Sequence, residues 1–186
     1  MKRLLLIAAA GVITVVGATV GGLIAPAVAG DGPLPAEVRE VRSEMARYHS
    51  LGQALKDGYV HEEGEPCVAS PPAPPSPDGG GTMGIHVVNP ALLGDPAIDA
   101  LRPELLLYVP KEKGKLKFVG VEYMRRAADQ TPPIDPSDRP SLFGRVFDGP
   151  MPEHAPGMGW HYDLHVWVAE ANPSGVFAVF NPAISC

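Results

Sequence analysis

The stretch from Met158 to Trp167, MGWHYDLHVW, is the densest group of chemically versatile side chains in the sequence. It holds two of the six histidines, both tryptophans and one aspartate. Imidazole and carboxylate groups are ligands of zinc and copper, and a histidine oriented by an aspartate can act as a base. The stretch can therefore be interpreted as a metal site, a catalytic dyad or a strand with a polar edge.

Alternation along a strand would place His161, Asp163, His165 and Trp167 on one face. At about 3.3 Å per residue, the two histidines would lie roughly 13 Å apart and Asp163 about 6.6 Å from each. One ion could then take Asp163 with either histidine, but both histidines only across a bulge. A helix would give the i, i+4 spacing of HExxH sites, but Tyr162 replaces the required glutamate, and the composition favours a strand.

Two further candidate ligands lie on other expected strands, His86 in GIHVV and Glu122 in FVGVEYM. Glu122 is expected to share a face with Leu116 and Phe118. If that face is buried, the carboxylate needs a cation or a hydrogen-bonded partner; otherwise it is solvated. The sequence predicts a His/carboxylate metal site drawn from His86, Glu122, His161, Asp163 and His165.

Zinc is the expected metal, with copper as a minority alternative. Copper is suggested by three methionines that each precede a histidine by three positions, namely Met83 and His86, Met151 and His154, and Met158 and His161. Thioether and imidazole together select copper. However, residues i and i+3 of a strand point to opposite faces, and methionine also fills hydrophobic gaps beside turns.

Several enzyme classes lack their signatures here. There is no GxSxG elbow and no Cys-His signature, and DGGGTMG has neither the lysine of a P-loop nor a dinucleotide fingerprint, so no nucleotide cofactor is expected. Metal-dependent catalysis would require an open coordination position, so enzyme activity stays undecided. The alternative function is a non-catalytic secreted binding domain with an aromatic platform around Trp160, Tyr162 and Trp167.

The elements that must position these side chains follow from periodicity. A helix is expected from Pro35, with a break near His49, a restart at the capping box SLGQ (50–53) and an end at Gly58. Strands are expected at 84–88, 104–109, 115–124, 161–169 and 176–180, with a hairpin turn at Gly114. The predicted fold class is α+β, an N-terminal helix packed on a mostly antiparallel sheet or partly closed barrel.

Two proline-rich segments interrupt this pattern. Residues 65–83 are expected to form an exposed loop, and residues 126–157 an ordered flap that covers the metal site. The whole of 30–186 is predicted to be one domain.

Residues 1–29 have the basic start, apolar run and A-x-A ending of a signal peptide, cut after Ala29. An uncleaved membrane anchor is the alternative, because the run is long enough to span a bilayer. The domain is therefore expected to be secreted, periplasmic or held at the cell surface. Without Lys2 and Arg3 it has 13 basic and 21 acidic residues, a net charge of −8. This charge argues against nucleic acid as a partner and against membrane contact beyond the leader, while a small-molecule or protein partner is not identified.

The only two cysteines, Cys67 and Cys186, are expected to form a disulfide, because an exported chain meets an oxidising compartment. A catalytic thiol is the weaker interpretation, since neither cysteine shows the signs of an activated thiolate.

Three blocks of the sequence resemble those of a known group of proteins. They are MGIHVVNPALL, RPSLFGRVFDGPMPEHAPGM and HYDLHVWVAEANPSGVFAVFNP. They are similar to a family of uncharacterised exported bacterial proteins with MGxHxVNP, PSLFGxxFDGPM and HYDLHVW blocks. The similarity extends over roughly 36–186, apart from the proline-rich loop. It implies export and a single structural unit, but it implies no reaction.

Overall fold

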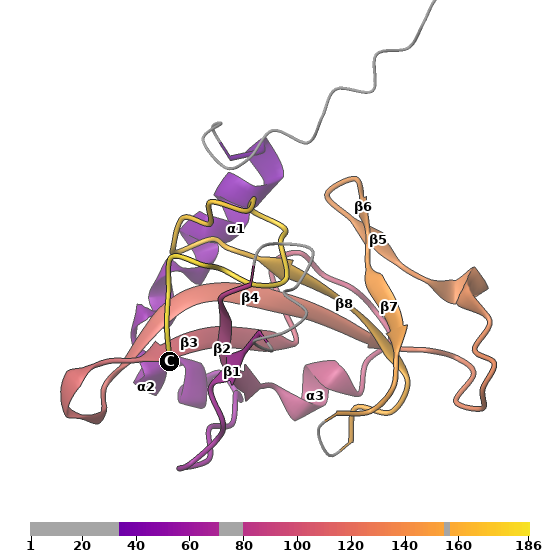
Figure 1. Cartoon of the computed structure of the whole chain (residues 1–186), viewed down its shortest axis with the longest axis horizontal. Coiled ribbons are helices and arrows are strands. Elements are labelled where there is room, and N and C mark those ends of the chain that lie inside the picture. The colour runs from indigo at the N-terminus through magenta and orange to yellow at the C-terminus, as the bar shows by residue number, and fades with distance from the viewer. Residues whose placement is uncertain (1–33, 71–79, 155–156) are drawn as a thin grey trace, which may run out of the picture.

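A short helical segment precedes a strongly curled antiparallel sheet in the computed structural model, which describes residues 34–70, 80–154 and 157–186 (Figure 1). The predicted α+β class is confirmed. The six strands lie in the order β1-β2-β3-β4-β8-β7. Their bounds are β1 Val68–Ala69, β2 Thr82–Val88, β3 Leu105–Pro110, β4 Leu116–Arg126, β8 His161–Val166 and β7 Asp148–Met151. A small hairpin of β5 (Ser141–Leu142) and β6 (Arg145–Val146) stands apart from this sheet.

The helical segment follows the predicted pattern of breaks. It consists of α1 (Ala36–Met45), a 3-10 turn (Ala46–His49) and α2 (Leu51–Lys56). Ser50 caps α2 by accepting a hydrogen bond from the backbone N–H of Gln53, and the chain leaves α2 through Gly58 at a φ of 92°. A third helix, α3 (Pro90–Leu93), is capped by Asn89.

Four of the five predicted strands are present, and the strands of the described sheet pair in antiparallel fashion. The predicted β3–β4 hairpin turns through Gly114, which has a φ of 68°. The prediction of a strand at 176–180 was wrong. There the carbonyl groups accept single hydrogen bonds instead of forming a ladder, because Trp167 uses those of Val176 and Ala178 and the Asn172 side chain uses that of Phe180.

The sheet has two buried faces. One packs on the helical segment, where Val38, Val41 and Met45 of α1 meet strand residues in the main apolar core. The strand residues of this core are Ile85, Val87, Leu106, Tyr108, Phe118, Val121, Tyr123, Tyr162, Leu164 and Val166. The opposite face carries two smaller apolar clusters. One is Leu107, Val109, Val119 and Trp167, and the other is Leu105, Met124 and Met158.

An irregularity in β4 determines which face receives Glu122. Leu107 pairs with Gly120 but Tyr108 pairs with Phe118, so Val119 is an additional residue in β4. The expectation that Glu122 shares a face with Phe118 is therefore wrong: Phe118 packs in the main core, while Glu122 projects from the opposite face.

The predicted disulfide between Cys67 and Cys186 is present. It ties the end of the chain to the segment just before β1. The proposed leader, residues 1–29, and the middle of the proline-rich loop, residues 71–79, lie outside the described residues. The ends of that loop pair as β1 and β2. Within the described part of the chain, no helix combines the length and apolar character needed to cross a membrane.

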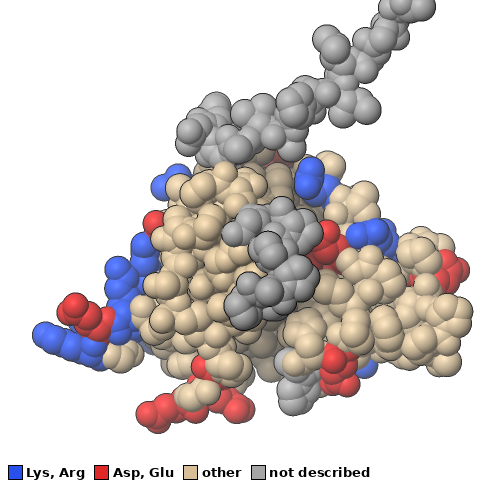
Figure 2. Space-filling view, viewed as in Figure 1, with Lys and Arg blue, Asp and Glu red and all other residues tan. Residues whose placement is uncertain are grey.

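Figure 2 shows the face of Figure 1 as a surface on which basic side chains occur singly or in small groups near the margins, among acidic ones. No broad basic area occurs among the described residues of this face.

Candidate metal centre

Three strands place His86, Glu122 and His165 together on the face of the sheet opposite the helices. Glu122 of β4 and His165 of β8 are paired directly, so their side chains leave the same face. His86 of β2 pairs with Leu107 of β3, so the His86 ring leaves this same face, but from a strand on the opposite side of β4 from β8. The strong curl of the sheet brings β2 towards β8 across the intervening strands.

The three ligand atoms fit a small cation. Glu122 Oε2 lies 3.1 Å from His86 Nε2 and 3.6 Å from His165 Nε2. One atom from each of the three side chains lies within 4.8 Å of the other two. Donors bound to one tetrahedral zinc ion are about 3.3 Å apart, given bond lengths near 2.0–2.2 Å. The three side chains could therefore ligate one ion after small adjustments.

The Glu122 carboxylate is buried, with 3 % of its side chain exposed. Burial alone would raise its pKa, but the imidazoles of His165 and His86, when they carry a proton, outweigh burial and lower the pKa to about 2. His86 Nε2 lies within hydrogen-bond distance of Glu122 Oε2, at 3.1 Å, but among the described residues no group makes a well-aligned hydrogen bond to this oxygen. A buried, ionised oxygen without a donor is costly unless a cation neutralises it.

The two other predicted ligands, Asp163 and His161, are not part of this group. Asp163 Oδ1 lies 3.9 Å from His165 Nδ1, beyond hydrogen-bond distance. Burial, with the charges of Glu122 and Asp148, raises the pKa of Asp163 well above its usual value. His161 turns its Nδ1 to the carbonyl of Gly159 at 2.9 Å, and its ring contacts His154 instead.

The apolar clusters flank the three ligands on both sides and reduce access of water. Leu107 is the strand neighbour of His86, and Leu105 is the strand neighbour of Glu122. Both leucines are fully buried. Electrostatic interactions are stronger in such surroundings than in water, which strengthens the attraction of the carboxylate for a cation.

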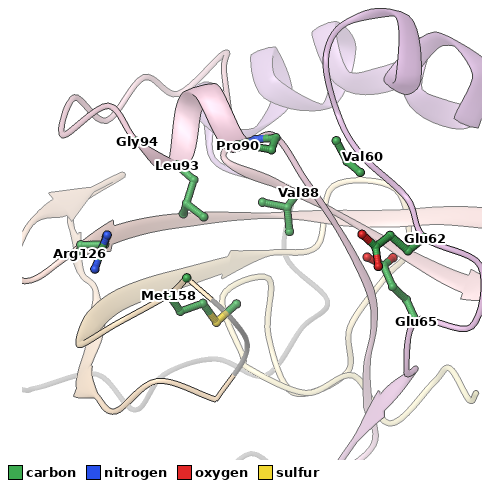
Figure 3. A pocket seen from close by; sticks show the side chains of 10 residues that line it. Val60, Glu62, Glu65, Val88, Pro90, Leu93, Gly94, Arg126 and Met158 are labelled. Atoms are coloured by element: carbon green, nitrogen blue, oxygen red, sulfur yellow. The ribbon is translucent and has the colours of Figure 1, made fainter.

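A pocket of about 430 Å³ lies next to the end of β2 and to α3 (Figure 3). Its lining residues are Val60, Glu62, Glu65, Val88, Pro90, Leu93, Gly94, Arg126, Gly157 and Met158. Figure 3 shows the Glu62 and Glu65 carboxylates on one side of it and Arg126 on the other. The three ligands are not among the lining residues, although Val88 follows His86 by two positions on the same strand.

The proposed aromatic platform does not form one exposed surface. Tyr162 and Trp167 are buried, at 0 % and 2 % exposed, and they belong to cores on opposite faces of the sheet. Trp160 is partly buried against the main core. The aromatic cluster that is present consists of internal contacts, such as those of Tyr48 with Tyr59 and Phe118.

Sequence reasoning missed one buried acid, Glu104, which is 1 % exposed and accepts a hydrogen bond from the backbone N–H of Met124. Burial raises the pKa of Glu104 to about 7. Its position directly before the run LLLYV was the available signal, because a near-continuous apolar run is typical of a strand that is buried on both faces.

Comparison with known protein families, curated proteins and solved structures found no match to this chain.

Proposed function

We propose that this chain is a metal-binding domain in which His86, Glu122 and His165 hold one divalent cation, and that the cation is zinc. Two imidazole nitrogens and one carboxylate oxygen are a donor set that zinc accepts, and their separations suit its bond lengths. Copper remains the minority alternative, since imidazole also suits it.

The observation that carries the proposal is the state of Glu122. A carboxylate is enclosed between two imidazoles, and no described residue makes a well-aligned hydrogen bond to Oε2. A purely structural role would favour a donor at this oxygen, as is usual for buried polar atoms. A metal ion bound by Oε2 and by the two neutral imidazoles would supply the positive charge in place of the imidazole protons.

Three protein ligands leave a fourth position for water on a tetrahedral ion, and a zinc ion bound in this way can lower the pKa of that water to near 7. His86 is the most exposed of the three, with 17 % of its side chain accessible, against 1 % for His165. A water or small substrate would therefore approach from the His86 side.

Export is part of the proposal. The leader-like residues 1–29 and the Cys67–Cys186 disulfide both support an oxidising compartment outside the cytoplasm.

Thermal unfolding with and without zinc tests the metal site. A cation that binds only the folded state stabilises it by about 2.7 kcal/mol at a hundredfold excess over Kd, an increase in Tm on the order of 5 to 10 °C for a domain of this size. We expect one zinc per chain by elemental analysis. Absence of bound zinc together with an unchanged Tm would refute the proposal.

Two variants with matched controls locate the ion. Glu122→Gln and His86→Asn should weaken zinc binding by at least about 100-fold, because even the loss of an outer partner of a ligand costs 10 to 100-fold. Glu104→Gln removes a different buried carboxyl, and His61→Asn removes a histidine paired with Glu65. Both controls should bind zinc like the unchanged protein.

A further inference from the structure

A second pair of imidazoles lies outside the proposed zinc centre. His161, the first residue of β8, contacts His154 of the segment between β7 and β8, with ring centroids 4.9 Å apart and planes inclined by 50°. His161 is fully buried and His154 is exposed. The pair therefore connects the interior of the sheet with the surface.

Both rings make the same hydrogen bond to the backbone. His161 Nδ1 lies 2.9 Å from the carbonyl oxygen of Gly159, and His154 Nδ1 lies 3.3 Å from that of Pro152. A carbonyl only accepts, so Nδ1 must donate in each ring. Each neutral ring then presents an unprotonated Nε2, which is the tautomer and orientation found in metal-bound histidines.

The buried nitrogen of this pair has no other partner. Among the described residues, no group forms a hydrogen bond with His161 Nε2. The turn that orients the ring is held in place, because the Gln130 side chain accepts from the Trp160 N–H and donates to the Trp160 carbonyl. Turning the ring over would give up the hydrogen bond of Nδ1 to Gly159.

A thioether lies next to the pair. Met151 of β7 is the direct strand partner of His161, so the two side chains leave the same face of the sheet where β7 and β8 run side by side (Figure 1). Neither cysteine offers a thiolate, since both are in the disulfide. Met151 is therefore the sulfur ligand closest in register to His161.

The charge of these donors selects the kind of cation. The three donors themselves, two neutral imidazoles and a thioether, carry no negative charge, and the nearest carboxylates that act on His161, those of Glu122 and Glu153, are not among them. A divalent ion usually takes at least one anionic ligand when it is enclosed, whereas a soft monovalent ion loses less hydration and prefers sulfur and imidazole ligands.

We propose that His154 Nε2 and His161 Nε2, together with the Met151 thioether, form a second metal site for a soft monovalent cation of the Cu(I) class. This site is separate from the zinc centre and does not depend on it. Its exposed ligand, His154, gives the ion a route from solvent to the buried His161.

Silver(I), a redox-inert ion of the same class, is the probe. Titration of the purified, zinc-loaded protein with Ag⁺ should show one equivalent bound per chain, and proton-detected ¹⁵N spectra should show both Nε2 atoms unprotonated before addition and shifted after it. His154→Asn should weaken Ag⁺ binding at least tenfold, and Met151→Leu should weaken it as well. Circular dichroism checks that the variants remain folded.

The controls separate this site from the zinc centre. His61→Asn and Met83→Leu, which change a histidine and a methionine outside the pair, should leave Ag⁺ binding unaltered. His86→Asn should weaken zinc binding at least about 100-fold but retain Ag⁺ binding. The inference fails if the protein takes up no Ag⁺, if His154→Asn and His61→Asn bind it equally, or if its binding is lost with His86→Asn instead.

Discussion

Two buried glutamates, Glu122 on β4 and Glu104 directly before β3, have opposite titration behaviour because their surroundings differ. Glu122 faces two imidazoles, which keep it ionised, and Glu104 has mainly one backbone N–H, which does not offset its burial. The residue type alone therefore does not identify a ligand. The partners across the strands decide whether a buried carboxyl carries a charge that attracts a cation.

Glu104 gives the unfolding free energy a specific pH dependence. Its pKa is raised from 4.5 to about 7 on folding, so between these values the folded state binds more protons than the unfolded state. Stability contributed by the protonated form is present below about pH 4.5 and is lost as the pH rises through 7, on the order of 3 kcal/mol in total. Glu104→Gln should not show this loss.

Chemical denaturation from pH 4.5 to 8 measures this effect as the difference between the unchanged protein and Glu104→Gln. All other titrating groups contribute similarly to both and largely cancel. We expect the variant to gain relative stability steadily with pH. A difference that stays constant over this range would show that Glu104 is ionised throughout.

At the scale of elements, the helix and four strands follow from sequence because their apolar periodicity is strong. The register between strands does not follow from it, since a shift of one residue reverses every side chain. The additional residue Val119 has this effect and moves Glu122 to the face opposite Phe118. Five candidate ligands could therefore be chosen from sequence. Which three of them form one group, and that His161 and Asp163 lie outside it, could not be predicted.

The failed strand at 176–180 has a related cause. Its residues have the composition of a strand, yet the indole of Trp167 and the amide of Asn172 take its carbonyl groups. Composition indicates that a segment favours strand conformation. It does not indicate which side chains will form hydrogen bonds to the backbone groups that a sheet would need.

Gly120 sets the spacing between β4 and β8 and thereby the position of two ligands. A Cβ at this residue would lie 2.8 Å from the carbonyl oxygen of Val166, the neighbour of His165. Gly120→Ala should push the strands apart, lower stability by about 1–3 kcal/mol and weaken zinc binding. Denaturant unfolding and zinc titration of the variant measure both effects.

Gly52→Ala in α2 is the matched control. A Cβ there would meet only Ser50 Oγ at 3.7 Å, so this change should stabilise the protein slightly, by about 0.5–1 kcal/mol, and leave zinc binding unaltered. Equal effects of the two substitutions on zinc affinity would show that strand spacing at Gly120 does not position the ligands.

At the scale of the whole molecule, the two faces of the sheet differ in what they bury. The face towards α1 holds most of the apolar core, and the opposite face holds buried imidazoles and carboxyls between two small apolar clusters. The disulfide closes a loop of 119 residues and, in the chain-entropy model, stabilises the fold by up to about 4 to 5 kcal/mol. Such a covalent tie helps offset the cost of burying so many polar groups on one face.

Anomalous X-ray diffraction from crystals of the zinc-loaded protein, recorded at the zinc absorption edge, tests the central claim most directly. The account predicts a strong peak bounded by His86, Glu122 and His165, with bonds of about 2.0 to 2.2 Å. A zinc ion bound elsewhere, with Glu122 still facing the two imidazoles and no ion between them, would contradict it.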